Sequence, residues 1–116
     1  MNLEQALQIL QTTFGFESFR LLQEQAIQNV LDKKDQLILM PTGGGKSLCY
    51  QIPAILLPGT TIVISPLIAL MEDQVTNLKI NGIKAAYYNS SLSGVEARNT
   101  LRQLHNGELD LLYISP

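Results

Sequence analysis

The stretch Met40-Pro41-Thr42-Gly43-Gly44-Gly45-Lys46-Ser47 determines how the rest of the chain is interpreted. It follows the apolar run 37–40, which is typical of a buried strand, and it opens a segment of helical character at 46–57. In such a loop the backbone N–H groups surround phosphate oxygens, and the positive end of the helix points at the same place. Lys46 adds a positive charge, and the Ser47 hydroxyl can ligate Mg²⁺. We therefore predict that the phosphates of a nucleotide bind to Thr42, Gly43, Gly44, Gly45, Lys46 and Ser47.

The strict phosphate-loop pattern has glycine at its first position, where this chain has Met40. The part from Gly43 to Ser47 is intact. The alternative is a glycine-rich turn that only connects a strand to a helix. Three consecutive glycines lose much conformational entropy on folding, so an ordinary turn rarely has them.

The periodicity of apolar residues predicts an α/β fold. Short apolar runs at 37–40, 61–64, 84–88 and 110–115 read as buried strands, and the segments between them read as helices. Repeated strand–helix–strand units give an open parallel sheet with helices on both faces. Two helices precede the sheet, at 2–13 and 19–31, with Asn2 and Ser18 as their caps. A later helix contains Pro53, which is expected to kink or end it.

Composition narrows the class of protein. The chain has 116 residues, 46% hydrophobic and 16% charged, with a net charge of −2, so a broad basic surface for nucleic acid is not expected. Apolar runs such as 54–57 are far too short to cross a membrane, and the N-terminus does not resemble a secretory signal. The single cysteine, Cys49, reads as a core residue. We expect a soluble protein of a reducing, intracellular compartment without membrane contact.

Four segments resemble the RecQ family of ATP-dependent DNA helicases. They are FGFESFRLLQ at 14–23, SLCYQIPA at 47–54, VISPLIALMEDQV at 63–75 and LYISP at 112–116. They are spread over nearly the whole chain, from residue 14 to residue 116, in order and with consistent spacing. The resemblance implies a RecA-like phosphate-loop fold whose sheet is incomplete in this chain. It also implies a helical adenine-recognition segment at 1–35 and the N-terminal part of the first motor domain at 36–116.

The resemblance further implies an enzyme that uses ATP and Mg²⁺ for 3′-to-5′ unwinding of DNA in repair, recombination and replication. It would act on single-stranded or partly duplex DNA, in the cytoplasm of a bacterium or the nucleus of a eukaryote. In this family the adenine ring stacks between an aromatic residue and an arginine, and a glutamine recognises the hydrogen-bonding edge of adenine. By the resemblance these roles fall on Phe16, Arg20 and Gln23. Taken alone, the same residues also fit a core aromatic and a solvated helix glutamine, and we assign Phe14 and Phe19 to the core.

By the same resemblance, single-stranded DNA lies near Ser65, Pro66, Leu67, Gln74 and Ser115. A serine hydroxyl and the N–H groups of a helix start can hold a phosphate without a lysine or arginine cluster. Ser65 also fits a plain helix cap. Because no Asp-Glu pair follows a further strand in this sequence, we expect the chain alone to bind ATP without hydrolysing it. Two alternatives stay open: another phosphate-loop enzyme, and a non-catalytic nucleotide-binding or interaction module.

Overall fold

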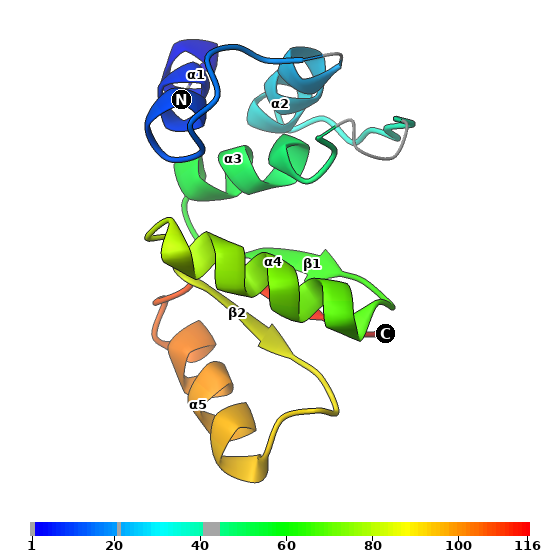
Figure 1. Ribbon diagram of the computed structural model, residues 1–116, viewed down its shortest axis with the longest axis vertical. Helices are drawn as coiled ribbons and strands as arrows, with labels where there is room; N and C mark the ends of the chain where they lie inside the picture. Colours follow the sequence, from blue (N-terminus) through cyan, green and yellow to red (C-terminus); the bar gives the residue numbers. More distant parts are fainter. Residues whose placement is uncertain (1, 21, 41–44) are drawn as a thin grey trace. The chain divides into compact units, whose positions relative to one another are not determined.

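Five helices and three strands form the parts of the computed structural model that are described, residues 2–20, 22–40 and 45–116 (Figure 1). Residues 1–58 make up one unit and residues 59–116 a second. The first unit is helical and the second contains the sheet. The domain boundary expected after residue 35 stays a prediction.

The first unit packs three helices, α1 (Leu3–Thr12), α2 (Gln23–Leu31) and α3 (Leu48–Leu56). Helix α1 begins as predicted at Asn2, whose side chain accepts a hydrogen bond from the Gln5 N–H while the Gln5 side chain accepts one from the Asn2 N–H. The helices bury one cluster, against which Phe14 and Phe19 pack, so their assignment to the core is confirmed. The fully buried members of this cluster are Ala6, Leu10, Ile27 and Ile52.

Two details of these helices differ from the prediction. Helix α2 begins at Gln23 with Leu22 at its N-cap, so Ser18 does not cap it. The sequence predicts that Pro53 kinks or ends its helix; it lies inside α3, which continues to Leu56, so Pro53 does not end the helix. A proline lacks only its own N–H, and its carbonyl still accepts a hydrogen bond from the Leu57 N–H at 2.8 Å.

The predicted strand at 37–40 is absent: these residues have irregular backbone, and Leu37 is 86% exposed. An apolar run becomes a strand only where a neighbouring backbone pairs with it, and none of the described residues pairs with this segment. Just before it, the Gln36 side chain donates a hydrogen bond to the Ala26 carbonyl of α2 at 2.8 Å. Three of the four predicted strands are therefore found.

The second unit alternates strands and helices as predicted. Its order is β1 (Thr61–Ile64), α4 (Ile68–Ile80), β2 (Ala85–Tyr88), α5 (Gly94–His105) and β3 (Leu111–Ile114). All three strands are parallel, and β3 lies between the other two, in the order β1-β3-β2. The α/β class of the fold is thereby confirmed.

Helices lie on both faces of this sheet. Helix α4 connects β1 to β2, at the far side of the sheet, and α5 connects β2 back to the central strand β3. The two connections run in opposite directions along the strand order. Because such crossovers are right-handed, α4 and α5 lie on opposite faces of the sheet. Leu104 of α5 packs against Ala86 and Leu112. Helix α4 buries Met71, Val75 and Leu78, whereas Leu67 and Leu70 are exposed.

Glycines and a capping box set the ends of these helices. After α4, Gly82 has a φ of +80°, and the following N–H, that of Ile83, reaches back to the Leu78 carbonyl at 3.0 Å. Helix α5 begins with Ser93 and Glu96, each of whose side chains accepts the other's backbone N–H. Gly107 follows α5 with a φ of +70°.

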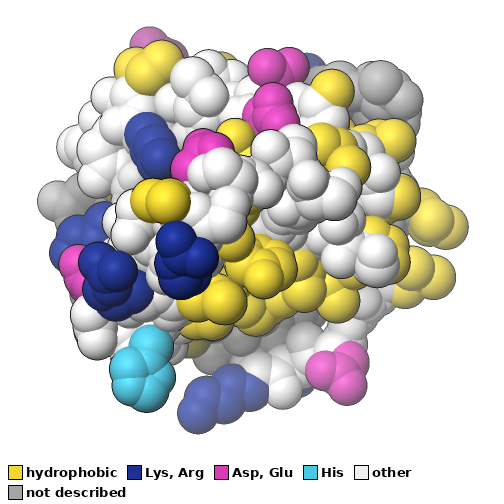
Figure 2. All heavy atoms as spheres, turned by 90° about the horizontal axis from the view of Figure 1, so that it is seen from below, with side chains coloured by type: hydrophobic (Ala, Val, Ile, Leu, Met, Phe, Trp, Pro, Cys, Tyr) yellow, Lys and Arg dark blue, Asp and Glu magenta, His cyan; other side chains and the backbone are white. Residues whose placement is uncertain are grey.

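The face of the sheet that carries α5 is only partly covered. The register places Ile62 opposite Leu112 and Ile64 opposite Ile114, on the side where α5 packs, yet both isoleucines of β1 are exposed. Figure 2 shows hydrophobic side chains gathered in one area of the surface, with Lys and Arg at its border.

In the described part of the chain, no helix is both long enough and apolar enough to cross a membrane.

Candidate functional site

The end of the glycine-rich loop leads directly into α3. The Gly45 carbonyl accepts a hydrogen bond from the Leu48 N–H at 3.3 Å, and the Lys46 carbonyl accepts one from the Cys49 N–H at 3.0 Å. The carbonyls of Gly45 and Lys46 therefore form the first turn of the helix, and the phosphate site itself stays a prediction. The predicted phosphate-binding residues Thr42, Gly43 and Gly44 lie outside the described residues.

Gly45 has a backbone conformation that favours glycine, and a side chain from α2 lies close to it. Its φ of +76° lies in the left-handed region, which other residues rarely adopt. A Cβ built on Gly45 would also overlap the Nε2 atom of Gln23. In the structure the end of the Gln23 side chain thus lies against the backbone of Gly45.

Lys46 and Ser47 stand at the positive end of α3 with their side chains accessible. Lys46 is exposed and Ser47 is half-buried. Ser47 occupies the N-cap position, but its backbone is helical and its hydroxyl makes no capping hydrogen bond. A cation and a hydroxyl at a helix N-terminus fit a metal-bound phosphate, since the helix dipole favours negative charge there.

Phe16 and Arg20 lie in the irregular segment between α1 and α2. The Phe16 N–H donates a hydrogen bond to the Leu10 carbonyl at 3.1 Å, and its ring is 49% exposed, so Phe16 is not a core residue like Phe14. The Arg20 side chain is also exposed. Both side chains are therefore accessible for stacking on a planar ligand.

Gln23 is buried, with only 2% of its surface exposed, so the interpretation of a solvated helix glutamine is wrong. Its Oε1 atom accepts a hydrogen bond from the Arg20 N–H at 2.8 Å, and its Nε2 atom donates one to the Gly45 carbonyl at 3.2 Å. The structure thus joins the predicted adenine segment to the predicted phosphate loop. No local pattern indicates this contact, because it connects residues 22 positions apart.

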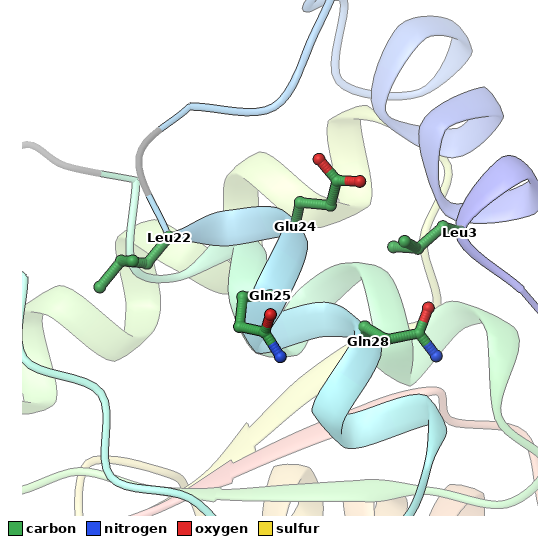
Figure 3. Close-up of a pocket in the computed structure, with 5 residues that line it drawn as sticks. All are labelled: Leu3, Leu22, Glu24, Gln25 and Gln28. Carbon is green, nitrogen blue, oxygen red and sulfur yellow. The ribbon is translucent and has the colours of Figure 1, made fainter.

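A shallow depression of about 280 Å³ on the other side of α2 does not contain the predicted adenine residues (Figure 3). It is lined by Leu3 of α1 and by Leu22, Glu24, Gln25 and Gln28. Glu24 and Gln28 extend toward Leu3 in Figure 3. This surface is distinct from the contact between Gln23 and Gly45.

Ser65 and Ser115 follow adjacent parallel strands, so they lie at the same edge of the sheet. The Ser65 N–H donates a hydrogen bond to the Ile114 carbonyl at 3.0 Å, and the Ser65 hydroxyl accepts one from the Leu67 N–H at 3.2 Å. The structure therefore groups four of the predicted DNA residues: Ser65, Pro66, Leu67 and Ser115. Gln74 lies on α4 about two turns beyond Leu67.

Sequence reasoning missed a polar cluster at the same edge of the sheet. Asn89 directly follows β2, is buried, and donates a hydrogen bond to the Met71 sulfur at 3.4 Å. Its Oδ1 atom accepts one from the Ser91 N–H at 2.8 Å, and the Ser91 hydroxyl donates to Glu72 at 3.2 Å. The position of Asn89 after a predicted strand was the available signal.

Comparison with known proteins agrees with this geometry. The sequence profile described as DEAD/DEAH box helicase matches residues 20–116. The chain belongs to the DEAD/DEAH box helicase family. Membership implies a RecA-like phosphate-loop fold and the use of ATP. It also selects among the classes of phosphate-loop enzyme that the loop alone leaves open.

Curated relatives of this helicase-family chain confirm the resemblance to RecQ. The ATP-dependent DNA helicase RecQ of Pasteurella multocida is 53% identical over 111 residues, which are 96% of this chain and 18% of that protein. RecQ of Bacillus subtilis is 50% identical over 115 residues, 98% of this chain and 20% of that protein. The ATP-dependent helicase SGS1 of Saccharomyces cerevisiae is 48% identical over 117 residues, 97% of this chain and 8% of that protein. The chain thus spans about a fifth or less of the length of these relatives.

Burial affects two ionisable side chains of this helicase-family chain. It raises the pKa of the Cys49 thiol, which lies in α3 and is part of the core as predicted. Burial also raises the pKa of the Tyr87 hydroxyl, and the carboxylates of Glu72 and Glu96 add to the effect. In the described ranges, no group of three or more His, Cys, Asp and Glu side chains is arranged to hold a metal ion.

Proposed function

We propose that this chain forms the ATP-binding part of an ATP-dependent DNA helicase of the RecQ type. The observation that supports this most directly is the hydrogen bond between Gln23 and Gly45. It connects the segment expected to read adenine with the loop expected to hold phosphates. The names of the relatives, ATP-dependent DNA helicase RecQ among them, support the same function.

In this proposal each residue has one role in holding the nucleotide. Lys46 neutralises charge on the β- and γ-phosphates, and Ser47 is the protein ligand of Mg²⁺. Phe16 and Arg20 enclose the adenine ring, and Gln23 pairs with its edge. Bound Mg²⁺ would supply further charge neutralisation at the phosphates.

Calorimetric titration of the chain with a non-hydrolysable ATP analogue and Mg²⁺ tests this binding. We expect Lys46→Ala to weaken binding at least tenfold, because it removes the cation at the start of α3. Lys34→Ala is the matched control: Lys34 is also an exposed lysine of the first unit, and binding should stay within twofold. Equal affinities for the two variants, or no binding by the unaltered chain, would refute the proposal.

We also propose that the edge of the sheet containing Ser65, Pro66, Leu67 and Ser115 binds the backbone of single-stranded DNA, with Gln74 further along α4. Binding there relies on hydroxyl and N–H groups, so it should depend only weakly on salt concentration. Fluorescence anisotropy with a labelled oligothymidine should show weaker binding for Ser65→Ala and no change for the exposed Ser90→Ala. A steep salt dependence would contradict this assignment.

For the whole protein we propose 3′-to-5′ unwinding of DNA in repair, recombination and replication, located in the cytoplasm of a bacterium or the nucleus of a eukaryote. The names of the relatives, ATP-dependent DNA helicase RecQ and ATP-dependent helicase SGS1, support an enzyme of this class. We expect the 116-residue chain alone to bind ATP without turnover. Phosphate release that disappears in the Lys46→Ala variant would contradict this expectation.

A further inference from the structure

The outer edge of β2 is an open strand edge. Strand β2 pairs with β3 on one side, and no other strand of the described residues pairs with it. Just before β2, the Lys84 carbonyl accepts hydrogen bonds from the Asp110 N–H at 2.7 Å and the Leu111 N–H at 3.2 Å, so it points toward β3. Successive residues of a strand direct their backbone groups to alternate sides, so those of Ala85 and Tyr87 point outward. This edge therefore offers backbone donors and acceptors to a further strand.

Two hollows follow this edge, and we call them together the edge groove. Strand β2 runs between α4 and α5 (Figure 1). The larger hollow, of about 300 Å³, and the smaller one, of about 220 Å³, share Lys79 of α4 and Gln103 of α5. Because α4 and α5 cover opposite faces of the sheet, a hollow that contacts both lies beyond the outer edge of β2. The two linings together include every residue from Ile83 to Tyr87, so the edge groove is continuous along the strand.

One buried side chain of the edge groove has a hydroxyl without a partner. Thr100 of α5 is 8% exposed and lines the smaller hollow. Its hydroxyl makes no hydrogen bond with any of the described residues. Every fully buried side-chain nitrogen or oxygen in the described ranges does have a partner, so the Thr100 hydroxyl keeps access to the hollow. A bound group that hydrogen-bonds this hydroxyl would satisfy it.

The charge of the edge groove that lacks a partner is positive. Lys79 and Lys84 line the larger hollow, and neither forms an ion pair with a described residue. The two carboxylates of the edge groove, Glu96 and Glu108, each accept a hydrogen bond from a residue nearby in the sequence, at 3.1 and 3.3 Å. A carboxylate in the larger hollow would therefore meet two lysines without an existing partner.

We propose that the edge groove binds an extended peptide segment of a partner protein. The segment pairs with the outward backbone groups of Ala85 and Tyr87 and places a carboxylate beside Lys79 and Lys84. Peptides bind exposed sheet edges in this way, with affinity from main-chain hydrogen bonds and specificity from side-chain pockets. A second copy of the chain does not fit, because the edge of each copy lies between its own two helices. The inference goes beyond the proposed nucleotide binding and does not depend on it.

Selection of short random peptides, displayed on phage, against the immobilised chain tests this surface. We expect the enriched peptides to contain a carboxylate and, in fluorescence anisotropy, to bind Lys79→Glu at least tenfold more weakly than the unaltered chain. Arg102→Glu is the matched control, because Arg102 is an exposed cation of α5 that lines neither hollow. It should change the affinity less than twofold. If no peptide is enriched, or if the enriched peptides bind both variants equally, the inference is overturned.

A pair of variants at residue 100 tests the smaller hollow. Thr100→Val removes the hydroxyl at nearly the same volume and breaks no hydrogen bond with the described residues, so the variant should fold normally. We expect it to bind the enriched peptides at least threefold more weakly, as for one lost hydrogen bond. Thr100→Ser keeps the hydroxyl and should stay within twofold of the unaltered chain. Equal affinities for Thr100→Val and the unaltered chain would overturn the placement of the peptide in this hollow.

Amide hydrogen exchange, followed by nuclear magnetic resonance, tests the strand pairing without any variant. In the free chain the N–H groups of Ala85 and Tyr87 should exchange faster than that of Ala86, which points toward β3. Saturation with an enriched peptide should slow the exchange of Ala85 and Tyr87 at least tenfold. Unchanged exchange at these two residues would overturn the inference. A free chain that is dimeric and already protected at both residues would show a second copy at this edge, and would also overturn it.

Discussion

Replacing Ile27 by alanine should unfold the first unit at much lower denaturant concentration. Ile27 has no exposed surface and packs with Ala6, Leu10 and Ile52 between the three helices. The change removes three carbon atoms, worth about 2 to 2.5 kcal/mol of transfer free energy at about 0.8 kcal/mol per methylene. The remaining cavity raises the expected loss to about 3 to 4 kcal/mol, within the range measured for such truncations.

The single cysteine provides a probe that is specific to this unit. Cys49 is buried in α3, so a thiol reagent reacts with it only after the surrounding core opens. With a urea slope of about 1 to 2 kcal/mol per molar for a small unit, the midpoint of Cys49 exposure should fall by about 2 M for Ile27→Ala. The urea dependence of the reaction at fixed pH measures this midpoint.

Ile80→Ala is the control, because Ile80 is also a helical isoleucine but is 76% exposed. Its change in unfolding free energy should stay within about 0.5 kcal/mol. A midpoint for Ile27→Ala that equals that of the unaltered chain would refute the packing of the three helices around this residue. Equal losses for both variants would refute it as well.

Four other predictions concern helix ends and the thiol. Gly82→Ala should lower the free energy of unfolding by about 1 to 2 kcal/mol, because the φ of Gly82 is +80°. Gly94→Ala is the control and should be neutral in thermal melting. Gly94 has an ordinary backbone conformation, and the nearest atom to an added Cβ would be 3.5 Å away. Ser93→Ala should cost about 1 kcal/mol by removing the cap of α5. Hydrogen bonds from Ser93 lower the pKa of Glu96 in the folded chain. The contribution of the Glu96 carboxylate to folding stability is therefore complete above its unfolded-state pKa and is lost as the pH falls through its lower folded-state pKa. Glu96→Gln should remove this pH dependence in thermal melts across acidic pH. Burial raises the pKa of Cys49, so iodoacetamide should alkylate the folded chain much more slowly than the urea-unfolded chain at pH 8, and equal rates would contradict its burial.

Local patterns were sufficient to predict the second unit. Its strands and helices are short-range features: β-branched runs, the Ser93–Glu96 capping box, and glycines such as Gly82 after a helix. The right-handed crossover rule then determined the parallel sheet and its two helical faces. Strand order was not predicted, because no local pattern indicates that β3 enters between β1 and β2.

The first unit shows what local patterns miss. Residues 37–40 have the apolar composition of a strand but lack a pairing partner among the described residues, and pairing is a tertiary property. The same limit applies to the candidate site. The loop and its helix were predictable from Gly45, Lys46 and Ser47, but the burial of Gln23 depends on the packing of α2 against α3.

The central place of β3 has a consequence for synthesis on the ribosome. Strands β1 and β2 each pair with β3, so neither has a sheet partner among the described residues until residues 111–114 are made. The polypeptide between Thr61 and His105 must therefore leave the exit tunnel with two strand edges unpaired. During that interval the nascent chain is open to aggregation and to chaperone binding. Nascent chains stalled before residue 111 should therefore be sensitive to protease. Chains stalled after residue 114 has cleared the tunnel should be more resistant.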